Sequence, residues 1–190
     1  MNSDTEVCNV ALTMIGAEKL TSLSDDDSDA AEACRRLYGP IRDEVVSAYF
    51  WREARARAAL SPLSETPAFE FDYQYLLPAD CLRPVELYGS LEVWTIEDRN
   101  LLTNETTVNL KYIKKITNVT NFSPELVSAI AARLASDLAV TLSGSKTLAE
   151  AMQSIYQIRI GSLVSTNNQG GGTPKQWTAD SENWADARLT

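Results

Sequence analysis

The chain has 190 residues, of which 44% are apolar and 23% charged, so it can bury a core and is not a disordered protein. Its 26 acidic and 17 basic residues give a net charge of −9, and this overall field repels nucleic acid. The chain contains no histidine, which excludes Ser-His and Cys-His catalytic pairs and histidine-ligated zinc sites.

Compartment and redox state are predicted from the same composition. No apolar stretch reaches the roughly 20 residues of a spanning helix, and the start at Met1 is acidic, so we expect a soluble, unexported protein with no membrane contact. Cys8, Cys34 and Cys81 are odd in number and form no CxxC pair, which predicts reduced and buried thiols.

The N-terminal third has helical periodicity. Apolar residues recur every three or four positions from residue 5 to 20, which predicts a first helix. Asp29 and Glu32 resemble a capping box, so a second helix is expected to begin there, with a kink or a restart at Pro40. Residues 52–60 (REARARAAL) also favour helix by their intrinsic propensity.

The middle of the chain has the features of a small antiparallel sheet. Aromatic residues on every second position of 69–75 predict a half-buried strand, which Pro78 ends. Residues 84–96 and 108–116 are rich in β-branched and aromatic side chains, and 100–104 is a short piece between them. The links are too short for crossover helices, so three or four antiparallel strands are expected.

Two more helices and a tail complete the prediction. Ser123, followed by Pro124 and Glu125, is a strong helix start, and leucine or isoleucine then recurs every fourth residue towards Gly144. A last apolar stripe over residues 147–164 predicts a helix antiparallel to it. The glycine-rich stretch 167–173 is linker material.

Catalytic and metal motifs are not supported by the sequence. An EF-hand loop that begins at Asp25 fails at its two discriminating places, because Ala30 replaces the glycine and Arg36 the final glutamate. Adjacent acids such as Glu97 and Asp98 point to different sides of a helix or strand. We therefore predict that the protein is not an enzyme and holds no cofactor or metal.

Arginines in the early helices are the first candidate for a binding function. A face that binds phosphate is one interpretation, and ion pairs between subunits are another, with Arg52, Arg55 and Arg57 as the candidates. The whole group is Arg35, Arg36, Arg42, Arg52, Arg55 and Arg57. Pairing with nearby acids is the favoured alternative, since those acids nearly balance the arginines. The acids concerned are Glu32, Asp43, Glu44 and Glu53.

The C-terminal tail is the second candidate. Trp177 and Trp184 lie two helical turns apart on a segment that is too short and too polar to fold alone, and Leu189 follows them. Exposed tryptophans are typical of anchors in a partner's pocket. The alternative, that these side chains pack back on the domain, stays open.

Four blocks of the sequence follow one another in a distinctive order. They stand at Cys8–Gly16 with Met14 in the variable place, Ser22–Asp26, Arg42-Asp43 with Val46 and Trp51, and Tyr73–Arg83. They are similar to a Cys-Asn-x-Ala-Leu-x-x-Ile-Gly helix, a Ser-Leu-x-Asp-Asp loop, an Arg-Asp-x-x-Leu helix that ends near a tryptophan, and a Tyr-x-Tyr-x-Leu-Pro-x-Asp-Cys-Leu-Arg block. Taken together, these blocks resemble phage tail tubular protein A, the head-to-tail adaptor (gatekeeper, connector) family of short-tailed phages. Tyr112-Ile113 and the 122–142 helix are similar as well, so that the resemblance covers roughly residues 5 to 164.

The resemblance implies a structural virion protein without a catalytic residue. Its partners would be the portal protein, the tail nozzle protein and further copies of itself in a ring, expected to be dodecameric, around the DNA exit channel. DNA would pass without specific binding, which fits an acidic protein. The implied location is the virion, at the head-to-tail interface, after assembly in the host cytoplasm.

The expected fold class is α+β and mainly α. It consists of a bundle of about four main helices with a small inserted antiparallel β region and an extended C-terminal tail. The domains would be a helical adaptor core (1–68 and 117–165), the β insertion (69–116) and a flexible tail (166–190). The alternative function is a helical, ring-forming DNA-binding packaging protein similar to a terminase small subunit. A two-carboxylate glycosidase is the less favoured enzyme alternative.

Overall fold

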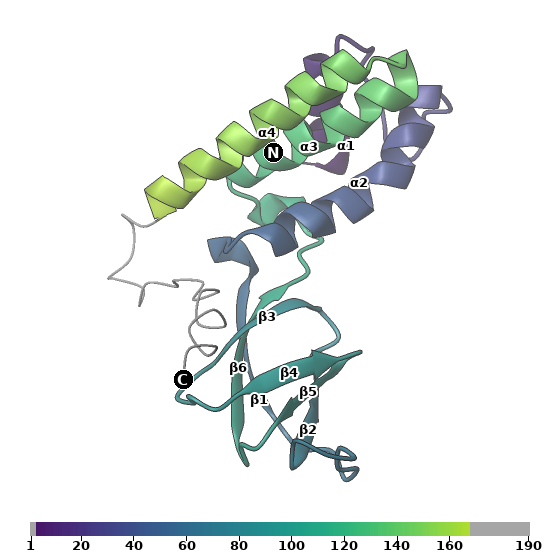
Figure 1. Cartoon of the computed structure of the whole chain (residues 1–190). Coiled ribbons are helices and arrows are strands. Elements are labelled where there is room, and N and C mark those ends of the chain that lie inside the picture. The colour runs from purple at the N-terminus through teal and green to yellow at the C-terminus, as the bar shows by residue number, and fades with distance from the viewer. Residues whose placement is uncertain (1–2, 168–190) are drawn as a thin grey trace.

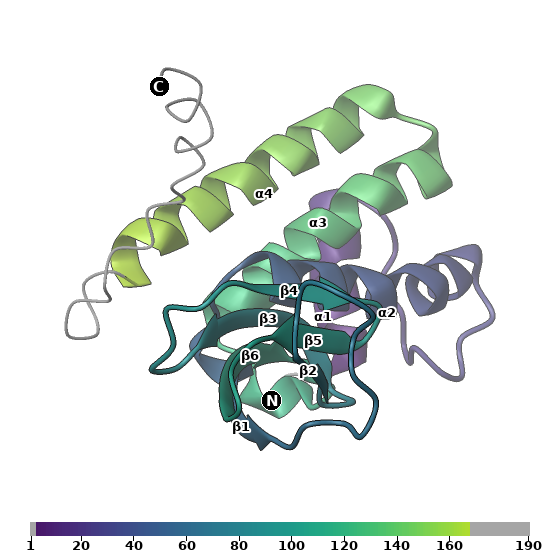
Figure 2. The ribbon, with the colours of Figure 1, turned by 60° about the horizontal axis from the view of Figure 1, so that its bottom comes forward.

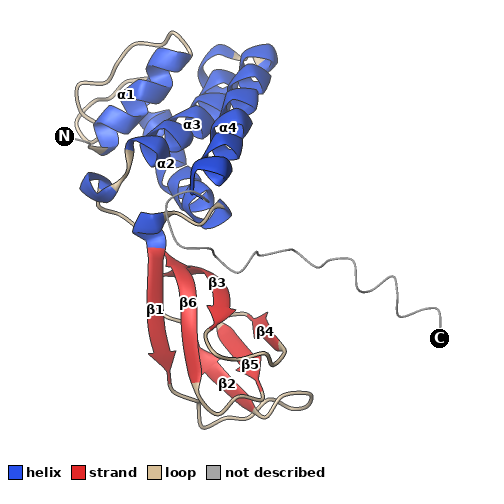
Figure 3. Cartoon of the chain, turned by 90° about the vertical axis from the view of Figure 1, so that its left-hand side faces the viewer, coloured by secondary structure: helices blue, strands red, loops and turns tan. Residues whose placement is uncertain are grey.

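The computed structural model describes residues 3–167, which form a helical lobe and a β lobe joined by two short connections (Figure 1). The two lobes lie end to end, with the helices gathered at one end and the strands at the other (Figure 3). The helices are α1 (Asp4–Met14), α2 (Asp29–Ala48), α3 (Pro124–Ser143) and α4 (Lys146–Asn167), with 3-10 turns η1 (Arg52–Ala54) and η2 (Val119–Asn121).

Local signals set the helix ends. The hydroxyl of Ser123 accepts the backbone N–H of Leu126 at 3.3 Å and caps α3, as the sequence predicts. Gly144 ends the same helix with φ at +64°, in the left-handed region that costs glycine nothing. Helix α2 begins at Asp29 as expected, but the predicted capping box is wrong, because Ser28 and not Asp29 is the N-cap.

Helix α3 is the centre of the helical lobe. It lies between α4 on one side and α1 with α2 on the other (Figure 2). Its side chains Leu126, Ile130, Leu134 and Leu138 are fully buried. In the described part of the chain α3 is also the one helix with the length and apolar composition of a membrane span, but it forms the core of this lobe.

The β lobe contains two three-stranded antiparallel sheets. Sheet A has the order β1-β6-β3 and sheet B the order β2-β5-β4. The two sheets pack against each other through a second core, which includes Tyr75 and Leu101 from sheet B and Leu110 from sheet A. The strands are β1 (Arg55–Leu60), β2 (Tyr73–Leu76), β3 (Cys81–Leu87), β4 (Trp94–Glu97), β5 (Asn100–Thr103) and β6 (Val108–Lys114).

This architecture corrects the expected fold class. A mainly helical bundle with one small inserted sheet was predicted, whereas the chain is a mixed α+β protein that is 46% helical and 21% strand. Six strands replace the three or four expected. The prediction failed because strand pairing joins distant segments, for which the sequence carries no local signal.

Three local predictions fail for identifiable reasons. Residues 55–60 form β1 despite their helix propensity, because every residue of the strand pairs with β6. Helix α2 is continuous through Pro40, so the restart expected there does not occur, and the expected kink stays a prediction. The strand expected at 69–75 shortens to β2, since Glu70 takes a φ of +72° and Phe69 lies 80% exposed.

Candidate functional site: the outer face of sheet A

Strand alternation places a row of cations on the outer face of sheet A. In β1 the side chains of Ala56, Ala58 and Leu60 pack against the second core, so Arg55 and Arg57 point the other way and are exposed. In the register of the sheet Arg57 lies beside Lys111 of β6, and Lys111 lies beside Glu86 of β3. The sheet therefore brings together charges that lie far apart in the sequence.

The cations on this face differ in how far they are neutralised. The ammonium of Lys111 lies 3.0 Å from Oε2 of Glu86 and 4.5 Å from the centre of the Tyr88 ring. The guanidinium of Arg55 lies over the Phe50 ring at 4.4 Å and donates to the Phe50 carbonyl at 3.2 Å. Arg57 has no hydrogen bond or ion pair with any residue between 3 and 167.

Arg83 of β3 is another unpaired cation of sheet A. It lies beside Ile113 in the register of the sheet, is exposed, and has no polar partner among the described residues. Desolvation lowers the pKa of Arg55 and of Arg83, because partial burial disfavours the charged form. Both guanidinium groups stay cationic, since the pKa of arginine lies far above physiological pH.

A hollow of about 500 Å³ opens on this face. The small side chain of Ala59, on the same face as Arg57, leaves room beside the longer ones around it. The guanidinium of Arg57, the ammonium of Lys111 and the amide of Asn109 can all donate hydrogen bonds there. Such donors recognise carboxylate or phosphate oxygens. The residues that line the hollow are Arg57, Ala58, Ala59, Tyr88, Asn109, Leu110 and Lys111.

The structure divides the arginines that the sequence grouped together. Local pairing is confirmed for Arg36, which lies 3.8 Å from Glu32, and for Arg42, which lies 2.8 Å from Asp43. It is wrong for Arg52, Arg55 and Arg57, none of which forms an ion pair within residues 3–167. Glu53, one of their expected partners, instead accepts the backbone N–H of Ser123 at 3.0 Å.

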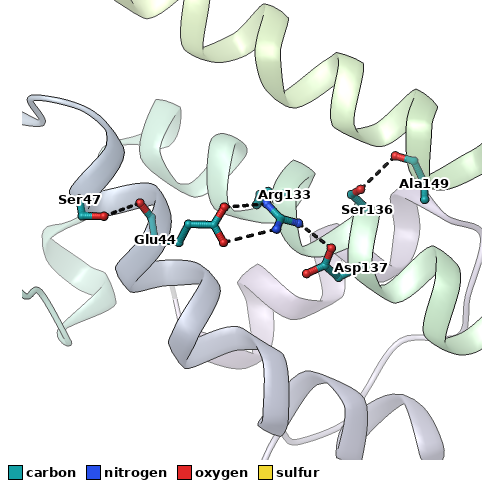
Figure 4. A network of polar contacts seen from close by, with 6 residues as sticks. All are labelled: Glu44, Ser47, Arg133, Ser136, Asp137 and Ala149. Atoms are coloured by element: carbon teal, nitrogen blue, oxygen red, sulfur yellow. Dashed lines mark hydrogen bonds and ion pairs between the residues drawn. The ribbon is translucent and has the colours of Figure 1, made fainter.

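A second hollow, of about 530 Å³, lies between α3 and α4, but its central cation is already neutralised. Arg133 donates to Glu44 at 2.9 Å and to Asp137 at 2.6 Å, and so ties α2 to α3 (Figure 4). Next to it, the Ser136 hydroxyl donates to the Ala149 carbonyl at 3.0 Å and ties α3 to α4. This cluster is a structural network, whereas sheet A leaves cations free to bind a partner.

The acidic α1–α2 loop has an internal role. The Asp25 carboxylate accepts the hydroxyls of Ser22 and Ser24, and these hydrogen bonds lower the pKa of Asp25. Asp26 accepts the backbone N–H groups of Thr21 and Ser28. In the part of the chain that the structure describes, no three His, Cys, Asp or Glu side chains gather as a metal site would need.

Cysteines and tail residues complete the comparison with the sequence. The prediction of free, buried thiols is confirmed for Cys8, Cys34 and Cys81. The candidate anchors Trp177, Trp184 and Leu189 lie outside the described residues, so the tail hypothesis stays a prediction.

Four residues of the basic face were missed by sequence reasoning: Arg83, Tyr88, Asn109 and Lys111. The alternation in VNLKYIKK does place Asn109 and Lys111 on one side of a strand. Only the pairing of β6 with β1 and β3 shows that Arg57 and Arg83 share this side.

No protein family model matches this chain, and none of the curated proteins is significantly similar to it.

Proposed function

We propose that this protein is a structural virion protein, a head-to-tail adaptor whose copies form a ring between the portal and the tail nozzle of a short-tailed phage. The observation that carries the proposal is the ordered series of four sequence blocks within residues 8–83. DNA would pass through the ring without specific binding, and the adaptor would act without catalysis. Its place would be the virion, after assembly in the host cytoplasm.

Side chains in these blocks have structural roles, and this supports an adaptor. Asn9 donates to the Leu20 carbonyl at 3.0 Å and accepts the Leu20 N–H at 2.7 Å, which fixes the start of the α1–α2 loop. Trp51 is buried and donates through Nε1 to the Val45 carbonyl at 2.9 Å. In a structural subunit, motif residues that hold the fold together are expected.

The shape of the chain also supports a ring subunit. A ring needs two unlike faces on each subunit, because every copy contacts the next in the same direction. A helical lobe and a β lobe that lie end to end give the subunit an elongated shape with long sides (Figure 3). The net charge of −9 favours the free passage of DNA through a channel that such subunits surround.

Light scattering tests the proposal directly. The purified full-length chain is measured alone and after mixing with the portal protein encoded in the same genome. We expect a complex that contains the portal and a full ring of this chain, dodecameric if the resemblance holds. A chain that never associates with the portal, at any ratio and at low salt, would contradict the adaptor function.

The tail supplies a second arm of this experiment. We expect removal of residues 170–190 to leave the denaturation of the protein unchanged and to weaken portal binding, because Trp177 and Trp184 would no longer insert into the portal. If the shortened chain binds the portal as tightly as the full-length chain, the tail has no role in portal binding.

A DNA-packaging protein similar to a terminase small subunit is the second candidate, and the basic face of sheet A is the observation that favours it. A DNA-packaging function predicts an affinity for duplex DNA that falls steeply as the salt concentration rises. An electrophoretic shift with duplex DNA at low and high salt separates the two functions, and the net charge of −9 favours the adaptor.

A further inference from the structure

The charges of the β lobe are divided between its two sheets. The strands of sheet A carry five cations and one carboxylate, namely Arg55, Arg57, Arg83, Lys111, Lys114 and Glu86. Strand β4 and the connections β1–β2, β3–β4, β4–β5 and β5–β6 carry seven carboxylates and one cation. These are Glu65, Glu70, Asp72, Glu92, Glu97, Asp98, Glu105 and Arg99. The strands of sheet A are therefore basic, with Arg57, Arg83 and Lys111 on the outer face, whereas β4 and these connections are acidic.

The basic face of sheet A and the carboxylate of Glu97 on β4 face in opposite directions. Sheets A and B pack against each other through the second core, so their outer faces point away from each other. In β4 the side chains of Trp94 and Ile96 pack against that core. Alternation then puts Glu97 on the outer face of sheet B, where it is exposed.

Charges on both sides are free to meet a partner. Arg57 and Arg83 have no polar partner within residues 3–167, and none of the seven carboxylates forms an ion pair there. The single cation on the acidic side, Arg99, donates to the carbonyls of Leu77 and Pro78 instead. Apart from the ion pair of Lys111 with Glu86, the charges on both sides are not neutralised within the described chain.

We infer that sheet A of one subunit docks against the acidic β4 side of sheet B in a second copy of this chain. Two unlike faces on opposite sides of one lobe make a head-to-tail contact, which repeats from copy to copy and closes into a ring when the rotation permits. The inference rests on the proposed ring and names the faces that meet in it. Arg57 on one side and Glu97 on the other are the central charges of this contact.

Other occupants of the basic face fit the charges less well. A symmetric dimer through sheet A would bring Arg57 and Arg83 of both copies together, and such like-charge contacts are repulsive. A nucleic acid would meet the basic face but would be repelled by the acidic side of the same lobe and by the net charge of −9. Copies of this chain in head-to-tail contact place opposite charges against both the basic and the acidic side.

Charge reversal tests this pairing, because the side chains of Arg57 and Glu97 are exposed and form no hydrogen bond or ion pair with the described residues. Arg57→Glu and Glu97→Arg are each expected to weaken self-association by ~10-fold or more, since each places like charges across the contact. The measurement is sedimentation equilibrium of the full-length chain over a range of concentrations at low salt.

Complementation between variants makes the test specific. In an equal mixture, the introduced carboxylate of the Arg57→Glu variant faces the introduced guanidinium of the Glu97→Arg variant. The unchanged Arg57 and Glu97 meet at the next contact, so association should return. The double variant R57E/E97R should recover it as well. Control reversals at exposed residues of the helical lobe, Glu18→Arg and Lys146→Glu, should change association by less than about 2-fold.

Several results would overturn the inference. Single variants that associate like the wild type, a mixture that stays dissociated, or a wild-type chain that remains monomeric would each do so. An Arg57→Glu variant that loses a shift of duplex DNA but keeps its self-association would assign the basic face to nucleic acid. The portal-binding measurement tests the adaptor function separately. A chain that binds the portal but does not form the contact between sheet A and sheet B would still be an adaptor.

Discussion

At the scale of single residues, Tyr112 and Asp80 fix the turn that leads from sheet B into sheet A. The Tyr112 hydroxyl donates to Oδ1 of Asp80 at 3.1 Å, and the backbone N–H of Lys115 donates to the Asp80 carbonyl at 2.7 Å. The sequence predicts that Asp80 lies in a turn. The structure adds that Asp80 links this turn to β6 through the hydrogen bond from Tyr112. Burial and the neighbouring carboxylate together raise the pKa of Tyr112 from 10.0 to about 12.

This pKa shift makes stability depend on pH in the alkaline range. Above pH 10.0 the unfolded chain loses the Tyr112 proton, whereas the folded chain keeps it up to pH about 12, so the free energy of unfolding falls between these values. Denaturant titrations are made below pH 10.0 and between pH 10.0 and about 12. The free energy of unfolding should fall more between these two conditions for the wild type than for Tyr112→Phe. An equal loss in both proteins would contradict the role of Tyr112.

At the scale of elements, the start of α3 combines a local helix cap with a hydrogen bond to a residue far away in the sequence. Ser123 caps the helix through its hydroxyl, and its own backbone N–H donates to the Glu53 carboxylate at 3.0 Å. Glu53 lies in η1, between α2 and β1, so the end of one connection between the lobes is tied to the start of the central helix. Sequence reasoning identified the cap and missed the partner, because Glu53 lies 70 residues away.

Removal of the cap should have a measurable cost. Ser123→Ala is expected to lower the free energy of unfolding by about 1 kcal/mol, because the N–H of Leu126 loses its acceptor at the helix start. Ser123→Asn keeps an accepting side-chain oxygen and is the matched control, with a change of less than about 0.5 kcal/mol. If both variants lose the same stability, the hydroxyl is not the stabilising group.

At the scale of the whole molecule, the junction between the two lobes is built around Trp51. Its ring is 3% exposed, belongs to the core of the helical lobe and lies edge-on to Tyr49 with 5.3 Å between ring centres. Strand β1 begins four residues later at Arg55, so this side chain anchors the chain where it leaves the helices for the sheets. Ile113 of β6 belongs to the same core as Trp51, so the two lobes are joined by a packed junction.

Truncation at this junction should be strongly destabilising. Trp51→Ala is expected to cost about 3–5 kcal/mol, because it leaves a cavity and an unpaired carbonyl at Val45. Trp94→Ala, in the half-buried β4, is the comparison and should cost less. Denaturant unfolding of the three proteins measures this, and a loss below about 1 kcal/mol for Trp51→Ala would show that the junction is not anchored by this ring.

The sequence by itself determined the features that depend on neighbours a few residues apart. Helix periodicity, the cap at Ser123 and the end of α3 at Gly144 follow from hydrogen bonds between nearby residues, and all three could be read in advance. The buried free thiols followed from composition and spacing in the same way.

Only the tertiary structure decided the sheets and the basic face. Residues 55–60 have the propensity of a helix, yet they form a strand because β6, about fifty positions further on, supplies their hydrogen bonds. The same pairing places Arg57 beside Lys111, and β3 then adds Arg83 to the face. Strand pairing is a long-range choice that depends on the whole core, so no local pattern could reveal which charges would share a surface.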